Sequence, residues 1–365
     1  MRGHESIGGA RVIQVAQRAG EEEAEQRLSE TALELTCRGG LAPCRPVRGN
    51  RRNFLAVGDG VAGVTAAAGG SRVALIKSRA VHFFYERLQE LSRPIARAPL
   101  KPQPATWDAN TLTLAWLGQA TVLINFYGVT ILTDPVLGAR VGIDLGLGVF
   151  GPKRFVAPAL AVRELPPVDV LLLSHAHMDH LDLPTLRRLA PAFAVTAKAT
   201  VDLLAGTPFA HATELRWGES VTYRGPRGEL RLEAFEVKHW GARTGRDTHR
   251  GYNGYVLERA GRKLIFGGDT AFTPSFQALR SQGPFVAAIM PIAAYRPWIF
   301  NHCTPEEALQ MADAAGAERL VPVHHSTFKL SDEPLAEPME RLETALCHEA
   351  GRLALRRIGE TCRLA

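Results

Sequence analysis

Three histidines and one aspartate lie within six residues of this chain, and all four side chains are of types that bind metal ions. They are His175, His177, Asp179 and His180, and they directly follow the largely apolar run 168–173, which is typical of a buried strand. A loop after such a strand can direct the first two histidines to one ion and the other two side chains to a second. Imidazole and carboxylate are ligands that zinc takes, at roughly 2.0–2.2 Å. The sequence therefore predicts a metal site in this loop.

Three further residues of the same types follow apolar strands later in the chain. His239, Asp269 and His324 each come shortly after such a strand, and His325 stands next to the last of them. Two glycines before Asp269 let the backbone approach an ion closely, and a carboxylate can bridge two cations. Any one of these residues alone is equally typical of a turn or of a hydrogen-bonded core histidine. Together they complete a candidate two-metal centre.

The elements that must position these residues are short strands that alternate with fewer helices. Hairpins and βαβ-like steps are mixed along the chain, which favours two mixed sheets flanked by helices over one doubly wound parallel sheet. Thr304 and Glu307 form a capping-box pattern around Pro305, which defines one helix start. Strands are expected at 112–117, 121–126, 129–133, 168–173, 193–196, 220–223, 230–237, 254–258, 263–266, 285–290 and 319–323, and helices at 183–189, 200–204, 273–281, 304–315 and 338–348.

The first hundred residues differ in character from the rest. Residues 1–80 show little apolar periodicity, and we expect a poorly ordered extension there, with at most a short helix over 22–35. Residues 81–105 are expected to form a helix and an extended arm. Residues 106–365 then form the folded domain.

Within the extension, Arg51 and Arg52 precede a weakly apolar, Ala/Gly-rich stretch, so that 51–70 has a twin-arginine, signal-like pattern. Asp59 interrupts the apolar part, and about fifty residues precede the arginine pair. A cytoplasmic protein is therefore the main expectation, and export through a twin-arginine signal is the alternative. No run of eighteen apolar residues occurs, so a membrane-spanning helix is not expected.

Charge and cysteine content restrict the class of partner. The net charge of +6 comes from scattered arginines, which hints at an anionic partner such as a phosphate or a lipid head group. No basic arm interleaved with aromatic residues occurs, so nucleic acid is not an expected partner. The five cysteines are Cys37, Cys44, Cys303, Cys347 and Cys362, and no C-x-x-C pair occurs. Reduced thiols are therefore expected, with neither a thiolate zinc site nor a disulfide framework.

The ligand series His175-x-His177-x-Asp179-His180, then His239, Asp269 and His324, resembles that of the metallo-β-lactamase superfamily. The resemblance implies an α/β fold, a four-layer αβ/βα sandwich of two mixed sheets with outer helices and a dinuclear site at one edge. Within the superfamily the chain is similar to the phospholipase D group that hydrolyses N-acyl-phosphatidylethanolamine. That similarity covers about 112–330 and is carried by 116–121, 133–136, Gly151-Pro152-Lys153-Arg154-Phe155, 164–169, 267–270, Tyr295-x-Pro297, His302-x-x-Pro305-Glu306-Glu307 and His324-x-x-Thr327-Phe328.

By this resemblance, His175, His177 and His239 hold one zinc ion, Asp179, His180 and His324 hold a second, and Asp269 bridges them. Because His324 occupies the family's ligand place before Thr327-Phe328, it is preferred to His325. The resemblance also implies that Met178, Tyr295 and His302 contact substrate. A side chain near a helix start that makes only local hydrogen bonds is the alternative for His302.

The chain departs from the family at three places. Gln119 stands where many relatives have histidine, Met178 replaces an aromatic residue that contacts substrate, and the Arg/Gly-rich segment 241–255 does not match. The identity of the substrate is therefore less secure than metal binding.

The resemblance implies a phosphodiester hydrolase. A zinc pair readies a water molecule for attack on phosphorus, with Asp179 orienting that water and His302 acting as hydrogen-bond or proton donor. The expected products are an N-acylethanolamine and a phosphatidic acid. A lactonase or an RNA phosphodiesterase on the same fold is the alternative, a non-catalytic metal-binding module is a further one, and iron could replace zinc.

Apolar residues beside the expected site suggest contact with a lipid surface. Trp298, Ile299 and Phe300 lie next to His302, and a second apolar run covers 145–150. These runs predict peripheral membrane contact. They are equally typical of core packing or of an oligomer contact, such as one in a homodimer.

Overall fold

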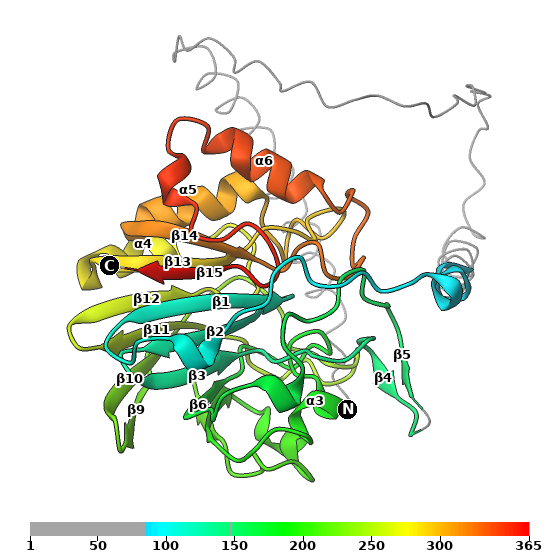
Figure 1. Cartoon of the computed structure of the whole chain (residues 1–365), viewed down its shortest axis with the longest axis horizontal. Helices are drawn as coiled ribbons and strands as arrows, with labels where there is room; N and C mark the ends of the chain where they lie inside the picture. The colour runs from blue at the N-terminus through cyan, green and yellow to red at the C-terminus, as the bar shows by residue number, and fades with distance from the viewer. Residues whose placement is uncertain (1–84, 147, 365) are drawn as a thin grey trace, which may run out of the picture. The chain divides into compact units, whose positions relative to one another are not determined.

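The computed structural model describes residues 85–146 and 148–364, and two mixed sheets form the centre of this part of the chain (Figure 1). The first sheet has the strand order β15-β1-β2-β3-β6-β7-β8. Its strands from β3 to β8 run parallel and its strands from β15 to β3 run antiparallel. Their bounds are β1 (Leu112–Gly118), β2 (Thr121–Phe126), β3 (Val129–Thr133), β6 (Val170–Leu172), β7 (Phe193–Ala197), β8 (Thr213–Leu215) and β15 (Thr361–Leu364).

The second sheet has six strands in the order β14-β13-β12-β11-β10-β9. Strands β12, β13 and β14 are parallel, and the other neighbours are antiparallel. A separate two-stranded hairpin consists of β4 (Ile143–Asp144) and β5 (Val149–Phe150). The bounds in the second sheet are β9 (Ser220–Gly225), β10 (Gly228–Phe235), β11 (Gly254–Arg259), β12 (Arg262–Phe266), β13 (Phe285–Pro291) and β14 (Ala317–Val323).

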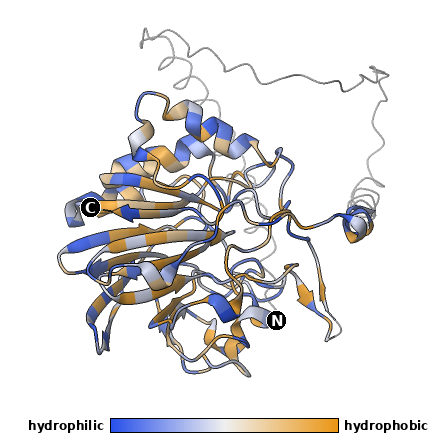
Figure 2. Ribbon diagram, in the orientation of Figure 1, coloured by the Kyte–Doolittle hydropathy of each residue, from blue (hydrophilic) through white to orange (hydrophobic). Residues whose placement is uncertain are grey.

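The core lies between the two sheets. Strands β1, β2 and β3 are buried along their whole length, because one face meets the other sheet and the opposite face is covered as well. Leu114 and Ile124 of the first sheet belong to the same apolar cluster as Leu257 and Ile289 of the second. Figure 2 shows long hydrophobic stretches in the strands of both sheets.

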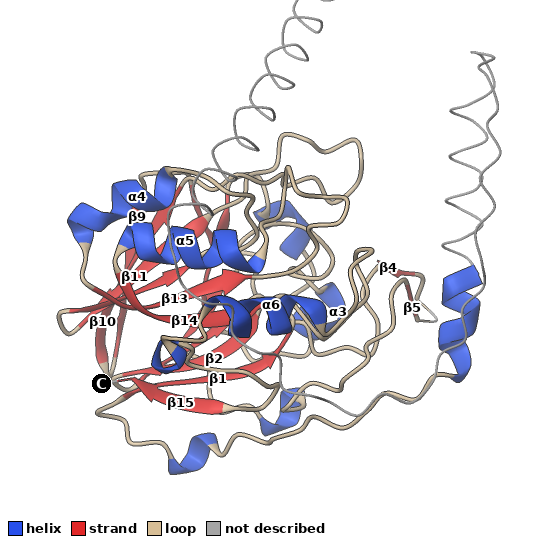
Figure 3. Ribbon diagram, turned by 90° about the horizontal axis from the view of Figure 1, so that it is seen from above, coloured by secondary structure: helices blue, strands red, loops and turns tan. Residues whose placement is uncertain are grey.

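Helices cover the second sheet on its outer side. In Figure 3, seen from above, α5 (Pro305–Ala315) and α6 (Glu337–Ala345) lie over β13 and β14, with α4 (Ser275–Ala278) beside them. Met311 and Leu342 pack in a second apolar cluster with Ile265 and Ala288 of this sheet. The outer side of the first sheet carries α3 (Leu183–Leu186) and 3₁₀ turns. Those turns and the others described are Pro104–Thr106, Val162–Glu164, Val201–Leu204, Leu279–Gln282 and Ala350–Arg352.

This layered arrangement of mixed sheets and helices confirms the predicted fold class. Every predicted strand of the domain is present, and 85–92 is helical within the predicted helix that precedes the arm. The sequence did not predict β4, β5, β8 and β15, which are two to four residues long. The predicted extension, its signal-like segment and the helix over 22–35 lie outside the described residues. None of the described helices has the length and hydropathy needed to cross a bilayer.

The predicted capping box forms at the start of α5. The Thr304 hydroxyl accepts a hydrogen bond from the Glu307 amide at 3.2 Å, and the Thr304 amide donates to the Glu307 carboxylate at 2.8 Å. The T304A variant should therefore lower the free energy of unfolding by about 1 kcal/mol, measured by urea denaturation. T304S keeps the hydroxyl and should unfold like the parent chain. Equal stability of the Ala and parent chains would contradict the capping role.

Candidate metal centre

The loop that carries the clustered ligands is fixed between a buried strand and a helix start. Strand β6 ends at Leu172, and the amides of His180 and Leu181 both donate to the carbonyl of His177, at 3.1 and 2.8 Å, which closes a turn. Asp182 then caps α3 by accepting from the Thr185 amide. Because strand, turn and cap follow one another directly, four ligand-type side chains leave the same edge of the sheet.

The structure brings all seven predicted ligands together from four separate parts of the chain. His175, His177, His239 and Asp269 offer one ligand atom each, all within 4.8 Å of one another, and Asp179, His180 and His324 form a second such group. The Nε2 atom of His175 lies 2.9 Å from Nδ1 of His177, and Nε2 of His239 lies 3.2 Å from it. These two groups have the composition that the sequence resemblance implied, and Asp269, His302 and His324 form a further, overlapping group.

Asp269 stands between the two groups. Its Oδ2 atom lies 3.1 Å from Nε2 of His180 and 3.2 Å from Nε2 of His324, and 4.0 and 3.9 Å from Nε2 of His175 and His239. One carboxylate oxygen is thus within reach of both histidine sets, which is the placement a bridging ligand requires.

Two buried polar atoms at this place fit a bound cation. Nε2 of His180, which lies 3.1 Å from Oδ2 of Asp269, and Oδ1 of Asp269 have no hydrogen-bond partner among the described residues. Unpaired buried polar atoms are costly, so they call for a partner of another kind. Imidazole and carboxylate donors without thiolate suit zinc or iron and differ from the thiolate-rich closed sites of structural zinc.

Asp134 is a functional residue to which sequence reasoning gave no role. It is fully buried after β3, and its carboxylate accepts from the amide and hydroxyl of Ser174, at 2.7 and 2.5 Å, and faces Nδ1 of His180 at 2.7 Å. Asp134 also lies close enough to His175 and His180 to be a ligand itself. Its oxygens are already occupied, so we assign it to orienting His180, as outer carboxylates do at metal sites. An acid directly after an apolar strand was the available signal.

His239 is oriented in the same way by the backbone. Its Nδ1 atom lies 2.8 Å from the carbonyl oxygen of Asn301, which leaves Nε2 directed at His177. His175 has a similar arrangement, with Nδ1 at 2.8 Å from the Ser174 hydroxyl. Hydrogen bonds of this kind select the ring tautomer that presents the other nitrogen to a metal.

Gln119, a departure from the family pattern, contacts the second ligand group. Its side-chain amide donates to Oδ2 of Asp179 at 2.8 Å, and that oxygen also lies 3.1 Å from Nε2 of His324. The backbone of Gln119 is held by Thr327 and Trp116 and accepts from the amide of His324. Gln119, Asp134 and His324 all have positive φ, a region that non-glycine residues adopt uncommonly.

The contact of Gln119 with Asp179 predicts a selective effect on one metal. The Q119M variant keeps the volume but removes the donor, so the affinity of the second site should fall by about 10–100-fold while the first site is unchanged. Cobalt titration followed by absorption spectroscopy measures the two affinities. An equal loss at both sites, or none at either, would contradict this role.

Arg243 ties the segment without family resemblance to the metal loop. Its guanidinium donates at 2.8 Å to the carbonyl of Ala176, between the first two histidines, and to that of Leu181, directly after the clustered ligands. Nearby, Arg250 binds the carboxylates of Asp202 and Asp247. The segment 241–255 therefore braces the loop in this chain by contacts of its own.

The residues predicted to contact substrate occupy different surroundings. His302 lines a groove of about 150 Å³ at the metal centre, with Nδ1 lying 3.8 Å from Oδ2 of Asp269 and no hydrogen-bond partner among described residues. Tyr295 is buried and its hydroxyl donates to Glu337 of α6. Met178 is half-buried in the metal loop. The groove is lined by His177, Asp179, Trp240, Asp269, Ala294, Trp298, Asn301, His302, His324 and Leu330, so Tyr295 and Met178 stay predictions.

Burial and neighbouring carboxylates set the electrostatics of the site. Burial lowers the pKa of His302 to about 4 and holds the pKa of His175 and His239 well below the usual value. Burial would lower the pKa of His324 too, but Asp269 and Asp179 raise it to about 9. The centre thus joins two carboxylates with the neutral imidazoles of His175 and His239, whereas the carboxylates favour the protonated form of His324. A divalent cation that binds here would take the place of that proton.

Comparison with known proteins identifies the class of the chain. Residues 129–325 match the beta-lactamase superfamily domain. The chain therefore belongs to the β-lactamase superfamily, as its ligand series predicted.

Individual relatives extend this assignment. An uncharacterized protein of Mycobacterium tuberculosis is 35% identical over 267 residues, which cover 70% of this chain and 69% of that protein. N-acyl-phosphatidylethanolamine-hydrolyzing phospholipase D 1 of Caenorhabditis elegans is 30% identical over 249 residues, which cover 64% of this chain and 69% of that enzyme.

A solved structure shares the fold. The isothiocyanate hydrolase from Delia radicum gut bacteria superposes with a TM-score of 0.55 at 17% identity, covering 69% of this chain and 99% of the other. At that identity the likeness concerns the fold alone.

Proposed function

We infer that the chain is a dinuclear zinc hydrolase that cleaves N-acyl-phosphatidylethanolamine to an N-acylethanolamine and a phosphatidic acid. The observation that carries this proposal is the convergence of two histidine groups on Asp269, beside a groove that contains His302. The similarity to the Caenorhabditis elegans phospholipase D supports the substrate class. Two bound zinc ions would stabilise charge on the phosphoryl oxygens and lower the pKa of a water molecule to near neutrality.

Asp179 is the residue that we expect to orient the attacking water. Its side chain is 16% exposed and lies in the groove, and Gln119 fixes its Oδ2 atom. The carboxylate therefore keeps a rigid position while accepting a hydrogen bond from water.

His302 is placed to act on the opposite side of the reaction. Its ring is only 11% exposed, and the amide of His302 donates to the Trp298 carbonyl at 2.9 Å, which holds the residue at the groove wall. As the water oxygen bonds to phosphorus and the phosphorus–alcohol bond breaks, the neutral ring of His302 donates a hydrogen bond to the departing ethanolamine oxygen. The proton that the attacking water loses ends on that oxygen, which leaves as the alcohol.

The decisive assay combines metal content with a substrate panel. The purified chain should contain two zinc ions and release N-acylethanolamine from N-acyl-phosphatidylethanolamine, and chelation should abolish turnover, with zinc restoring it. Preferential cleavage of a lactone or of RNA would reassign the activity to those alternatives. A full metal content with no hydrolysis of any of the three substrates would indicate a non-catalytic module. If the metal analysis found two iron ions, iron would take the place of zinc in the proposal.

Exposed aromatic residues near the groove are proposed to contact the lipid surface. Trp298 is 45% exposed and Phe300 63% exposed, and Trp240 on the groove wall is 47% exposed. Aromatic side chains partition favourably into a membrane interface. The W298S/F300S variant should therefore bind anionic phospholipid vesicles at least several-fold more weakly in a sedimentation assay. The control is W217S, which changes an equally exposed tryptophan that does not line the groove, and this variant should bind vesicles like the parent chain. Unchanged binding of W298S/F300S would remove this surface from the proposal.

A further inference from the structure

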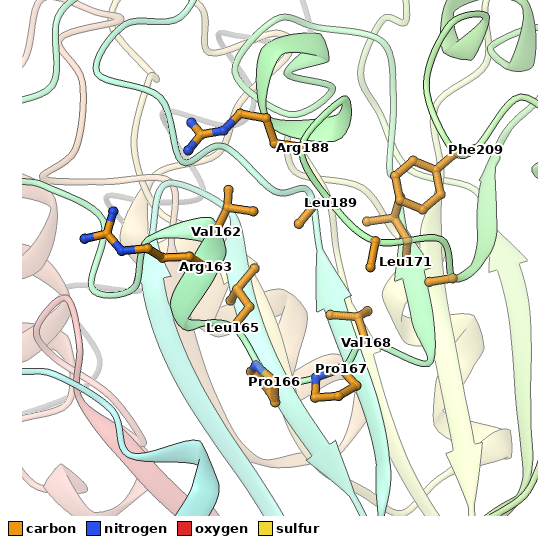
Figure 4. Close-up of a pocket in the computed structure, with 12 residues that line it drawn as sticks. Val162, Arg163, Leu165, Pro166, Pro167, Val168, Leu171, Arg188, Leu189 and Phe209 are labelled. Atoms are coloured by element: carbon orange, nitrogen blue, oxygen red, sulfur yellow. The ribbon is translucent and has the colours of Figure 1, made fainter.

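The outer side of the first sheet has a cavity where the sequence predicts helix. Helix α3 ends at Leu186 instead of extending to 189, and the chain runs on towards β7 without further helix. A cavity of about 520 Å³ lies here, between β6, residues 188–192 and the segment 162–168 that leads into β6 (Figure 4). Its volume is in the range of small-molecule sites, roughly 300–1,000 Å³.

The lining of this cavity is almost entirely apolar. Ten of the twelve lining residues are aliphatic, proline or phenylalanine. Leu171, Leu189 and Phe209 are buried side chains that belong to the main core cluster. Such a lining favours a hydrocarbon group, because burial removes apolar surface of both partners from water.

The remaining two lining residues are arginines. In Figure 4 the guanidinium groups of Arg163 and Arg188 both lie to the left of the apolar side chains. Neither side chain makes a hydrogen bond or ion pair with another residue that the structure describes. The adjacent carboxylate of Glu164 binds Lys101 at 2.7 Å and the Ala161 amide at 2.8 Å instead. The cavity therefore combines an apolar interior with two solvent-exposed arginines at its rim, of which Arg163 also lies in the field of Glu164, and its lining contains no carboxylate.

We propose that this cavity binds a single aliphatic chain that ends in an anionic head group. The chain lies against Leu171, Leu189 and Phe209, and the head group, a carboxylate or a phosphate, accepts hydrogen bonds from Arg163 and Arg188. The cavity shares no lining residue with the metal-centre groove. The site is therefore separate from the proposed hydrolysis and does not depend on it.

Calorimetric titration of the metal-loaded full chain with defined amphiphiles tests this site. Below its micellar concentration, dodecanoate should bind with one molecule per chain, and octanoate should bind more weakly by roughly fourfold for each methylene removed. Dodecanol, which has the same chain without a charge, should bind at least tenfold more weakly than dodecanoate. Comparison of dodecanoate with dodecyl phosphate decides which head group the arginines prefer.

Four variants locate the bound probe. R163Q/R188Q should weaken dodecanoate binding at least tenfold and leave dodecanol unchanged, whereas R187Q, beside the cavity but paired with Asp144 at 2.9 Å, should have no effect. A192W fills the cavity and should abolish binding of both probes; A190W does so from an exposed position if A192W does not fold.

Two results would overturn the proposal. One is the absence of dodecanoate binding to the parent chain. The other is dodecanoate binding that R163Q/R188Q and the tryptophan variants leave unchanged, which would place the probe elsewhere, such as the metal-centre groove.

Discussion

Replacing Asp269 with asparagine should leave a folded chain that no longer holds metal at either site. Its turnover should fall by at least about 10²–10³-fold, the range for removal of one preorganised electrostatic group. The expectation follows from position, since Oδ2 of Asp269 lies within 4.0 Å of nitrogen atoms of five histidines. Asparagine has nearly the same shape but no charge, so neither histidine group keeps its shared anionic ligand.

The measurement is metal content by elemental analysis, together with hydrolysis of N-acyl-phosphatidylethanolamine. D313N is the matched control, because Asp313 is exposed on α5 and pairs only with Arg352 at the surface. That variant should keep both ions and full turnover. A D269N chain that retained two ions and its activity would show that Asp269 is not the bridge, and the proposed centre would have to be abandoned.

The position of Asp269 also shows which parts of the site the sequence alone can predict. The four ligands of the loop are adjacent in sequence, so type and spacing predict their convergence directly. His239, Asp269 and His324 lie on other strands, and their shared place after apolar runs indicates an edge of the fold without fixing which ion each one faces. The division into two groups was implied by family resemblance, and it stays a prediction because the ligand atoms form overlapping groups in the structure.

The residues that the sequence did not reveal are those whose partners are distant in the chain. Gln119 contacts Asp179 sixty residues later, and Arg243 contacts Ala176 across 67 residues. No periodicity connects such pairs, because the packing of the two sheets creates their contacts. Asp134 is similar, with a role that becomes visible only when His180 is placed beside it.

Edge elements escaped prediction for a related reason. Strand β15 has the sequence Thr-Cys-Arg-Leu, which carries little apolar signal, and it forms because β1 offers an antiparallel partner from Leu112 to Ala115. Helix α3 was predicted too long because 183–189 includes arginines and leucines that favour helix, whereas the chain turns directly after Leu186. The cavity of about 520 Å³ lies at this place, where the predicted helix is absent.

His302 is the residue whose replacement separates metal binding from chemistry. The H302A variant should keep two zinc ions while turnover falls by about 10²–10⁴-fold, the usual contribution of a positioned acid or base. Its ring faces the groove with Nδ1 unpaired, 3.8 Å from Asp269, and the seven proposed ligands do not include it. Metal retention is therefore expected, in contrast to D269N.

The comparison of the two variants is more informative than either one alone. If His302 made only local hydrogen bonds near the start of α5, H302A would lower stability and leave turnover per folded chain unchanged. If it acts on the leaving group, turnover falls most for substrates with a poor leaving group, because a good leaving group departs without a proton. An aryl phosphodiester should therefore recover most of the lost rate in H302A and none of it in D269N. H348A, an exposed histidine outside the groove, should match the parent chain on both substrates.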